Sequence, residues 1–405
     1  MEIIDRLSDI KEWEALLSYK QDGGHISRTE EKDLSDFIQS GQWKEIAKKI
    51  QNNEPFSHPK ITELNKKHAS KKRIVFTFER DESYALKLIT YMLGEYDGLF
   101  SPNLYSFRRT FGVTRAISDI LGRSGINQMH SFKADISDYF NSVNYEKLLF
   151  MLKRAIRNED KLIAFLTTLL SDPYAVRDSQ LIKAKKGIMA GVPVSAFLAN
   201  VYLAEMDKYF YEAGAVYARY SDDIIIFAKS KEELGMLKRK FKEFINSLDL
   251  DLNEKKVVET GPNEPWEFLG FKYDSGDIDV GEVAIDKIKG KMKRKARALY
   301  RWKNKKNADN DRAIKAFVRY YNKKFFNNSI SSEITWCRWY FPVITTDKGL
   351  KEIDRYVQDC IRFIAAGNYS ASRFKLKYED IRDLGYKSLV NKYYAFRQGK
   401  YEPVT

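Results

Sequence analysis

The pattern of hydrophobic and polar positions changes twice along the chain. Residues 1–70 show short helical stripes separated by polar turns, with Trp13 and Leu16 on one stripe. Residues 71–280 alternate strand-like runs with helical spacing. From residue 281 the strand-like runs stop, and helical patterns rich in Lys, Arg and aromatic residues continue nearly to the end. The middle part therefore predicts an α+β domain with a small, mainly antiparallel sheet.

The middle part predicts its elements individually. Strands are expected at 73–78, 132–136, 216–220, 223–227 and 268–273, and helices at 83–93, 145–156, 196–209 and 231–248.

The charge of the chain indicates what kind of partner it binds. The 405 residues carry 70 Lys and Arg against 56 Asp and Glu, a formal net charge of +14. Residues 284–326 hold sixteen Lys and Arg but three Asp, so nearly all of the surplus lies there. A 43% hydrophobic content excludes a disordered basic tail. The chain is thus expected to fold and to bind a polyanion.

Within the basic segment, Ile288, Met292, Leu299 and Trp302 fall near one helical face. The opposite face is a candidate wall of a nucleic-acid groove. Its proposed contacts are Lys293, Arg294, Arg297 and Arg301. An ordinary solvated helix and a helix lying on a membrane surface are the alternatives.

The expected location of the protein rests on its cysteines, its N-terminus and its apolar runs. Cys337 and Cys360 form neither a disulfide framework nor a CxxC metal pattern, which suits a reducing compartment. The N-terminus lacks the pattern of a secretory signal, and no apolar run approaches the ~20 residues that cross a bilayer. A cytoplasmic protein without a membrane partner is expected.

Acidic residues provide the strongest candidate chemistry. Asp222 and Asp223 lie between two predicted strands, at the tip of a hairpin. Adjacent carboxylates repel unless a cation offsets them, although Asp is also common in ordinary turns. Asp135 ends the predicted strand 132–136 and supplies a third carboxylate. Three acids on neighbouring strand ends predict a site for two Mg²⁺ ions.

A glycine turn precedes the predicted helix 196–209. Gly191 stands two residues before Pro193, so the backbone can approach a planar ligand without a Cβ in the way. The turn is also a helix start with Ser195 as its N-cap, and the two readings are compatible.

The order of these motifs resembles the reverse transcriptases. The motifs are an Asp-Ile strand end with an aromatic residue five positions on (135–140), Gly-x-Pro-x-Ser (191–195), Tyr-x-Asp-Asp (220–223), Leu-Asn-Glu-Lys-Lys (252–256), Phe-Leu-Gly-Phe (268–271) and, upstream, Leu-Tyr-Ser-Phe-Arg (104–108). The resemblance covers roughly residues 71–300. It is greatest to the bacterial branch that contains group II intron, retron and defence-associated or abortive-infection enzymes.

The resemblance implies a right-hand polymerase fold. Residues 1–70 would be a helical N-terminal extension, 71–280 the fingers and palm, and 281–405 a basic helical thumb and C-terminal region. The implied activity is RNA-directed DNA synthesis from dNTPs at a primer 3′-hydroxyl, with an RNA template and an RNA–DNA duplex as partners.

The resemblance also implies a role for each matching residue. Two Mg²⁺ ions, with Mn²⁺ as a substitute, would be held by Asp135, Asp222, Asp223 and the carbonyl of Ile136. Phe140 would be the steric gate that selects deoxynucleotides, or else a core aromatic residue. Lys256 would be a general acid near the leaving pyrophosphate, or else a solvated cation. The implied substrate contacts are Gly191, Tyr220, Arg73 and Arg108.

Departures from the family pattern refine the expectation. Ala190 stands where the family usually has Gln, and Ser221 where Ala is commoner. No retron-type Val-Thr-Gly and no zinc-finger or HNH tail is found. Ala190 removes a polar contact near the incoming nucleotide, whereas the missing motifs favour the defence-associated enzymes. A companion non-coding RNA would then be the template, and a homo-oligomer is compatible with this reading. Untemplated or protein-primed DNA synthesis and a catalytically silent nucleic-acid-binding scaffold are the alternatives.

Overall fold

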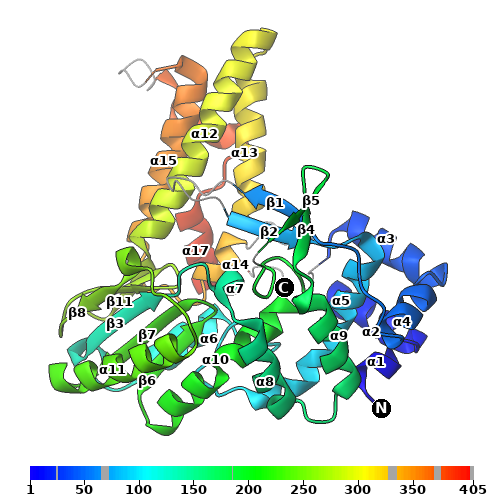
Figure 1. Ribbon diagram of the computed structural model, residues 1–405. Helices are drawn as coiled ribbons and strands as arrows, with labels where there is room; N and C mark the ends of the chain where they lie inside the picture. The colour runs from blue at the N-terminus through cyan, green and yellow to red at the C-terminus, as the bar shows by residue number, and fades with distance from the viewer. Residues whose placement is uncertain (24–25, 65–72, 185, 327–334, 369–374, 402–405) are drawn as a thin grey trace. The chain divides into compact units, whose positions relative to one another are not determined.

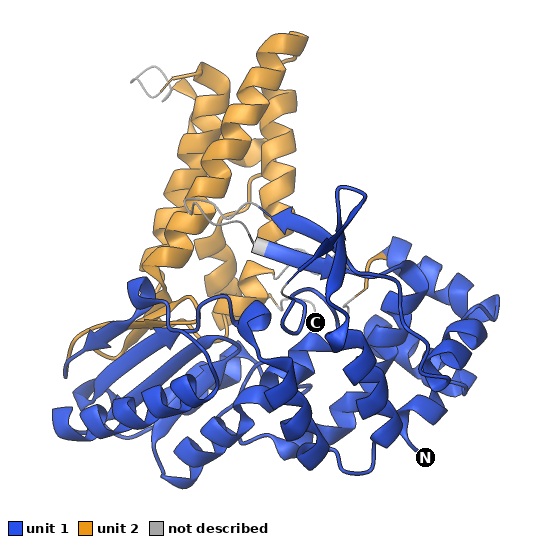
Figure 2. Ribbon diagram, in the orientation of Figure 1, with its two compact units in different colours: residues 1–22, 28–262 blue, residues 23–27, 263–405 orange. Residues whose placement is uncertain are grey.

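A computed structural model of the chain describes all residues except 24–25, 65–72, 185, 327–334, 369–374 and 402–405. The chain forms two units. Unit 1 contains residues 1–22 and 28–262, and unit 2 contains residues 23–27 and 263–405 (Figure 2). The predicted boundary at residue 70 falls outside the described residues.

Unit 1 begins with the short helices that the stripes predict. They are α1 (Ile3–Arg6), α2 (Ile10–Asp22), α3 (Arg28–Gln39) and α4 (Trp43–Gln51). The buried Trp13 ring packs at 5.4 Å from Phe37 and 6.3 Å from Trp43, measured between ring centroids. Residues 60–64 differ from the helical expectation, because they form a strand, β1.

The strand β1 (Lys60–Leu64) belongs to a four-stranded sheet of unit 1. The order is β2 (Arg73–Thr77), β1, β4 (Tyr174–Arg177) and β5 (Gln180–Lys183). β1 pairs antiparallel with β2 and parallel with β4. The amide of Phe76 in β2 donates to the carbonyl of Ala190 at 2.8 Å, so this sheet is bonded to the glycine turn.

A second sheet of unit 1 carries the acidic residues. Its order is β6 (Val216–Tyr220), β7 (Asp223–Ala228), β3 (His130–Asp135) and β8 (Val258–Thr260), and every pair is antiparallel. β7 is buried without interruption from Ile224 to Ala228, as its continuous apolar run predicts. Helix α11 (Lys231–Ser247) packs on β3 and β7, and α10 (Ser195–Glu212) packs on β6 (Figure 1).

The remaining helices of unit 1 surround these sheets. They are α5 (Arg80–Leu93), η1 (Gly94–Leu99), α6 (Val113–Leu121), η2 (Ile126–Gln128), α7 (Tyr139–Ser142), α8 (Tyr145–Ala155), α9 (Asp160–Ser171) and η3 (Glu254–Lys256). The predicted helices 83–93, 145–156, 196–209 and 231–248 are confirmed within a few residues at each end.

Unit 2 opens with a small antiparallel sheet, ordered β11 (Asp277–Val280), β10 (Phe271–Asp274) and β9 (Trp266–Phe268). The single strand predicted at 268–273 is therefore wrong. Leu269 and Gly270 adopt positive φ values of 51° and 85°, which turn the chain between β9 and β10.

Helices make up the rest of unit 2, as predicted after residue 281. They are α12 (Glu282–Lys306), α13 (Asn310–Phe326), α14 (Trp336–Tyr340), α15 (Lys348–Ala366), α16 (Tyr378–Asp383) and α17 (Leu389–Arg397). α12 packs on α15 and α13, and Ile288 and Met292 of α12 are buried. Trp302 does not follow this stripe, since 36% of the residue is exposed.

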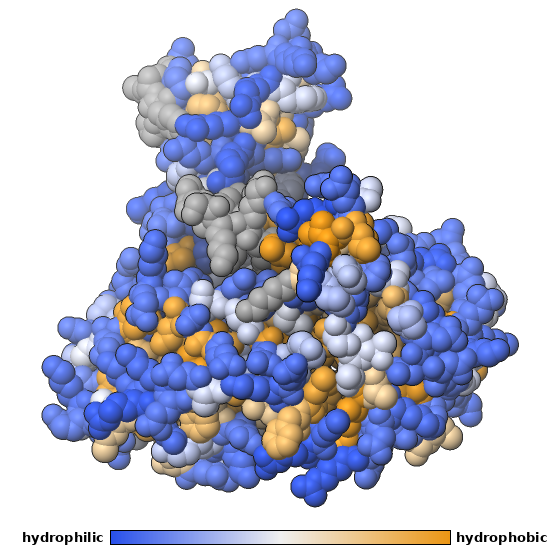
Figure 3. Space-filling view, viewed as in Figure 1, coloured by the Kyte–Doolittle hydropathy of each residue, from blue (hydrophilic) through white to orange (hydrophobic). Residues whose placement is uncertain are grey.

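The carboxylate of Asp354 fastens α17 to α15. It accepts hydrogen bonds from the hydroxyl of Tyr386 at 2.5 Å, the hydroxyl of Ser388 at 2.6 Å and the amide of Leu389 at 2.9 Å. Cys337 and Cys360 are buried free thiols. Among the described residues no helix has the length and apolar character needed to traverse a bilayer, and the face shown in Figure 3 is mostly hydrophilic.

Candidate active site

The β6–β7 hairpin presents the acidic pair through a two-residue turn. Tyr220 pairs with Asp223 across the hairpin, which leaves Ser221 and Asp222 in the turn. Ser221 has a φ of 61°, and its amide donates to the hydroxyl oxygen of Ser106 at 2.8 Å. Its carbonyl accepts a hydrogen bond from Arg219 at 3.1 Å. The turn is therefore held in one conformation from both sides.

The register of the central sheet brings the third carboxylate to this turn. Asp135, the last residue of β3, lies directly opposite Asp223 in β7. The amide of Ile136 donates to the carbonyl of Asp222 at 3.1 Å. The structure thus places the backbones of the three predicted aspartates and of Ile136 side by side.

Burial and charge act together on Asp222. Removal from solvent is the largest influence, followed by the nearby carboxylates of Asp135 and Asp223, and these raise the pKa of Asp222 to about 6. An acid with a pKa raised by two neighbouring acids indicates a cluster that is short of positive charge.

Lys256 places a positive charge beside the three aspartates. Its ammonium lies 2.5 Å from Oδ2 of Asp135, while the side-chain amide of Asn253 donates to Oδ1 at 3.2 Å. Partial burial lowers the pKa of Lys256, but the hydrogen bond to Asp135 and the three carboxylates outweigh it, so the pKa is raised overall.

The cluster matches a hard divalent cation in donor chemistry and in charge. Carboxylate and carbonyl oxygens are the ligands that Mg²⁺ prefers, and the raised pKa of Asp222 marks a need for a cation. Across the described ranges, however, no three His, Cys, Asp or Glu side chains converge tightly enough to hold an ion as they stand. The oxygen of Asp135 that faces Lys256 is already bound to that ammonium.

Phe140 lies in α7, five residues after Asp135, and is half-buried. Its ring meets Phe107 edge to face, with centroids 6.2 Å apart and an interplanar angle of 86°. Phe107 is 52% exposed. The Phe140 carbonyl accepts from the amide of Ile188 at 2.8 Å, which bonds α7 to the glycine turn.

Gly191 is required by packing within the protein. Its φ is 99°, and a Cβ there would lie 2.3 Å from Cγ1 of Val75 and 3.1 Å from the carbonyl oxygen of Phe76. The backbone at Gly191 is therefore approached by β2. Ser195 is not an N-cap, because it is the first residue of α10 and its hydroxyl donates to the carbonyls of Ile188 and Met189.

The other predicted substrate contacts differ in their surroundings. The guanidinium of Arg108 binds Asp97 at 2.8 Å and the carbonyl of Ser101 at 2.9 Å, and it lies 3.7 Å from the ring centroid of Phe111. Arg108 thus holds its own loop together. Burial raises the pKa of Tyr220. Arg73 lies in β2, but its side chain is outside the described part of the structure.

A buried ion pair next to the hairpin turn was not predicted from the sequence. Arg219 and Asp207 are fully buried and bonded, and Asp207 also accepts from the hydroxyl of Tyr217 at 2.7 Å. An arginine inside an apolar strand was the available signal, since such a charge requires a buried partner.

The predicted groove wall lies in unit 2. Lys293, Arg294, Arg297 and Arg301 are all exposed on α12.

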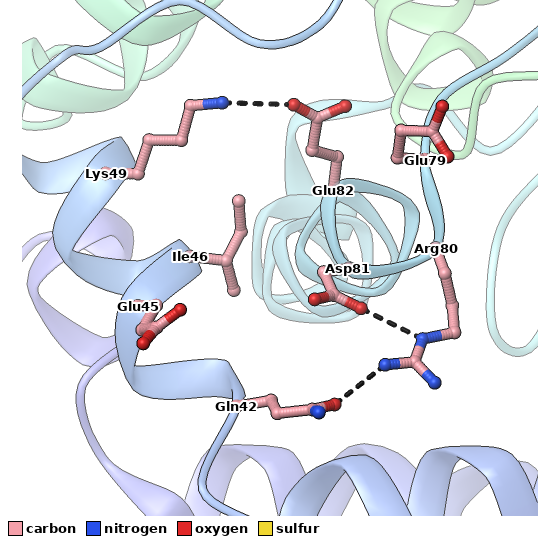
Figure 4. Close-up of a pocket in the computed structure, with 8 residues that line it drawn as sticks. All are labelled: Gln42, Glu45, Ile46, Lys49, Glu79, Arg80, Asp81 and Glu82. Carbon is pink, nitrogen blue, oxygen red and sulfur yellow. Dashed lines mark hydrogen bonds and ion pairs between the residues drawn. The ribbon is translucent and has the colours of Figure 1, made fainter.

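A cavity of about 400 Å³ lies among the N-terminal helices of unit 1, apart from the aspartates (Figure 4). Four of its charged residues are paired within the cavity. Lys49 lies 3.2 Å from Glu82, and Arg80 binds Asp81 at 2.9 Å and Gln42 at 2.7 Å. This internal pairing leaves the aspartate cluster as the candidate active site.

Known proteins are similar in sequence to this part of the chain. Residues 64–273 match the family described as "Reverse transcriptase (RNA-dependent DNA polymerase)". The group II intron-encoded protein LtrA of Lactococcus lactis subsp. cremoris is 40% identical over 81 residues, which are 20% of this chain and 13% of that protein. The retron Ec86 reverse transcriptase of Escherichia coli is 26% identical over 106 residues, 25% of this chain and 33% of that enzyme.

The matches to these relatives are partial. The chain spans a third or less of the length of the curated relatives. The apo telomerase of Candida tropicalis is 12% identical with a TM-score of 0.49, over 82% of this chain and 60% of that one, a likeness too low to add to the assignment. The family match alone covers more than half of the chain and includes Asp135, Asp222 and Asp223. The chain therefore belongs to the reverse transcriptase family.

Proposed function

We propose that the protein is an active RNA-directed DNA polymerase that adds dNTPs to the 3′-hydroxyl of a primer. The observation that carries this proposal is the meeting of Asp135, Asp222 and Asp223 at the ends of adjacent strands, with the pKa of Asp222 raised to about 6. A silent scaffold would have no need to keep three acids together at the cost of their mutual repulsion.

Asp135, Asp222 and Asp223, with the carbonyl of Ile136, would hold two Mg²⁺ ions, or Mn²⁺ in their place. Bound there, divalent cations lower the pKa of the attacking hydroxyl and neutralise charge on the phosphates. The aspartates position the reacting groups, and the fixed turn at Ser221 keeps Asp222 and Asp223 in register with Asp135.

Lys256 is proposed as the proton donor to the leaving pyrophosphate. Its raised pKa keeps it protonated at neutral pH, and 57% of its side chain is exposed, so the proton is accessible. Its bond to Asp135 places this proton beside the cluster.

Phe140 is proposed as the steric gate. Its ring is half-buried and lies beside the exposed ring of Phe107, which supports a position at the edge of the site more than one in the core. Gly191, Tyr220, Arg73 and Arg108 remain candidate substrate contacts. Gly191 and Arg108 already have structural contacts that account for their residue types.

We also propose the arrangement of a right-hand polymerase. Residues 1–70 would form an N-terminal extension, residues 71–280 the fingers and palm, and residues 281–405 the thumb and C-terminal region. The exposed cations on α12 would contact the backbone of an RNA–DNA duplex.

The biological setting that we propose is defence against phage, with a companion non-coding RNA as template and the cytoplasm as location. The partial similarity to a group II intron-encoded protein of Lactococcus lactis and to a retron enzyme of Escherichia coli supports a bacterial setting. Untemplated or protein-primed synthesis by the same aspartates is the second candidate. Sequencing of the DNA made in cells separates the two, because a templated product would match a co-purified RNA.

Primer extension on an RNA template with Mg²⁺ tests the proposal. Asp222→Asn and Asp223→Asn should each lower incorporation by more than about 100-fold. Asp178→Asn is the matched control, since Asp178 is an exposed turn residue with a φ of 49° that Asn also accepts. Equal incorporation by wild type and Asp222→Asn would refute the assignment.

A further inference from the structure

The end of α12 and the start of α13 border a cleft for which the polymerase chemistry provides no role. The cleft has a volume of about 530 Å³. Its lining residues belong to unit 2: Trp302, Asp309, Asp311, Arg312, Lys315, Ala316 and Arg319.

Trp302 is the aromatic wall of the cleft. The residue is 36% exposed, whereas Ile288 and Met292 of the same helix are buried. The guanidinium of Arg312 lies over one face of the indole ring, 5.6 Å from its centroid. A partly exposed indole with a cation over one face has the elements of a platform on which a nucleobase stacks.

Three cations form the opposite wall. Arg312, Lys315 and Arg319 are spaced three and four residues apart, so they lie on one face of α13. All three are exposed, and within the described ranges none of them forms an ion pair. Asp309 and Asp311 belong to the N-terminal end of α13, where Asp309 accepts a hydrogen bond from the amide of Asp311 at 2.7 Å. No described carboxylate therefore has to be displaced before these cations contact phosphates, and Arg312 can do so while it lies over the indole.

Hydrogen bonds of Lys303 connect the end of α12 to the start of α13 and to α15. The ammonium of Lys303 donates to the carbonyl of Ile364 at 2.7 Å and to the side chain of Asn310 at 2.8 Å. The amide of Ala308 donates to the carbonyl of Lys303 at 2.9 Å. The small side chain of Ala316 leaves the space between the walls open. Such a preformed cleft loses little conformational entropy when a ligand enters.

We infer that this cleft binds single-stranded nucleic acid, with one base on Trp302 and adjacent phosphates on Arg312, Lys315 and Arg319. The bases of a duplex are stacked on one another, so their faces are not accessible to the indole. Trp302 lies roughly 100° around α12 from Arg301, which places it beside the proposed duplex face and not on it. The inference does not depend on the aspartate cluster.

Fluorescence anisotropy of the full chain tests the stacking wall. The probes are a short labelled oligo(U), the matching oligo(dT) and a short RNA–DNA hybrid. Trp302→Leu should weaken binding of the single strand by about 5- to 100-fold, while Trp302→Phe retains most of it. Affinity for the hybrid should change less than about twofold. A loss for oligo(U) but not for oligo(dT) would mean that the ribose 2′-hydroxyl is recognised, and equal losses would mean that base and phosphate suffice.

The phosphate wall has its own test. Arg312→Gln/Lys315→Gln/Arg319→Gln should reduce the salt dependence of oligo(U) binding by about 2 in the log–log slope. Lys11→Gln/Lys44→Gln/Lys48→Gln removes the same charge from exposed positions of unit 1 and should leave the slope unchanged.

Either of two results would overturn the inference. The first is an unchanged affinity for oligo(U) in Trp302→Leu when that variant has a native circular dichroism spectrum. The second is displacement of labelled oligo(U) by poly-glutamate as effectively as by unlabelled oligo(U). Asp222→Asn separates this inference from the proposed function, because it should abolish primer extension and leave oligo(U) binding intact.

Discussion

Arg219 and Asp207 form an ion pair that is fully buried on both sides, with Nη2 of Arg219 2.5 Å from Oδ2 of Asp207. Arg219 also donates to the carbonyl of Ser221, the first residue of the turn between β6 and β7. The pair therefore connects α10 to the turn that presents Asp222 and Asp223.

Breaking this pair should destabilise unit 1. Arg219→Met leaves Asp207 buried without its partner, so we expect a loss of about 3–5 kcal/mol in the free energy of unfolding, measured by urea denaturation. The double variant Asp207→Leu/Arg219→Met removes both charges and should recover most of that loss. Primer extension by the double variant should remain low, because Ser221 has lost its donor. Full recovery of activity would show that the pair serves stability alone.

Stability should depend on pH through Asp222. Its pKa is about 6 in the folded protein against an ordinary value of 3.8, so the folded state holds the proton more tightly. The contribution of Asp222 to the free energy of unfolding is greatest below about pH 4. It falls as the pH rises to about 6 and stays at its lowest value above that pH. The total decrease in unfolding free energy is about 3 kcal/mol.

Asp222→Asn isolates this effect. In EDTA the variant should exceed wild type in unfolding free energy at pH 8, and the difference should shrink at pH 5. Addition of Mg²⁺ should reduce the difference at pH 8, because the cation stabilises the wild-type carboxylate. No difference at either pH would contradict the burial of an uncompensated charge at this position.

Phe140→Ala should relax sugar selection. Removal of the ring leaves room for a 2′-hydroxyl, so incorporation of ribonucleotides relative to deoxynucleotides should rise by about 10- to 100-fold. Single-nucleotide extension with matched dNTP and rNTP measures the ratio. Phe150→Ala, at a position 64% exposed on α8, is the aromatic control and should leave selection unchanged. An unaltered ratio in Phe140→Ala would exclude the gate role.

Lys256→Gln should lower kcat by about 100-fold or more if Lys256 donates the proton. Lys256→Arg keeps the charge beside Asp135 but gives up its proton far less readily, so its kcat should also fall while stability is retained. Lys255→Gln changes the adjacent exposed cation and is the control. Wild-type kcat in Lys256→Arg would indicate that only the charge is needed.

Neutralising the exposed face of α12 should weaken duplex binding. With Lys293, Arg294, Arg297 and Arg301 changed to Gln, the log–log salt slope for an RNA–DNA hybrid should fall by about 3 to 4. Lys11, Lys32, Lys44 and Lys48 changed to Gln provide a charge-matched control in unit 1. Anisotropy titrations over a range of salt give both slopes, and identical slopes would remove α12 from the proposed duplex contact.

The sequence predicted the elements that hold the aspartates because those elements have clear periodicity. The strand 216–220 matches β6, and 223–227 lies within β7 (Asp223–Ala228). Prediction failed where a local conformation overrides the apolar run, as at Leu269 and Gly270. It also failed where the partner lies on another element. Neither the bond between Arg219 and Asp207 nor the exposure of Trp302 can be derived from spacing, since both depend on which helices and strands pack together.

The contact at Gly191 couples the movement of two parts of unit 1. The amide of Phe76 is bonded to the carbonyl of Ala190, and Val75 occupies the space that a side chain at Gly191 would need. β2 and the turn before α10 are thus joined by a hydrogen bond and are in close contact. A displacement of the β1–β2–β4–β5 sheet would be transmitted to the start of α10, the helix that also carries Asp207. The β6–β7 hairpin is in this way connected to a sheet that contains neither of its strands.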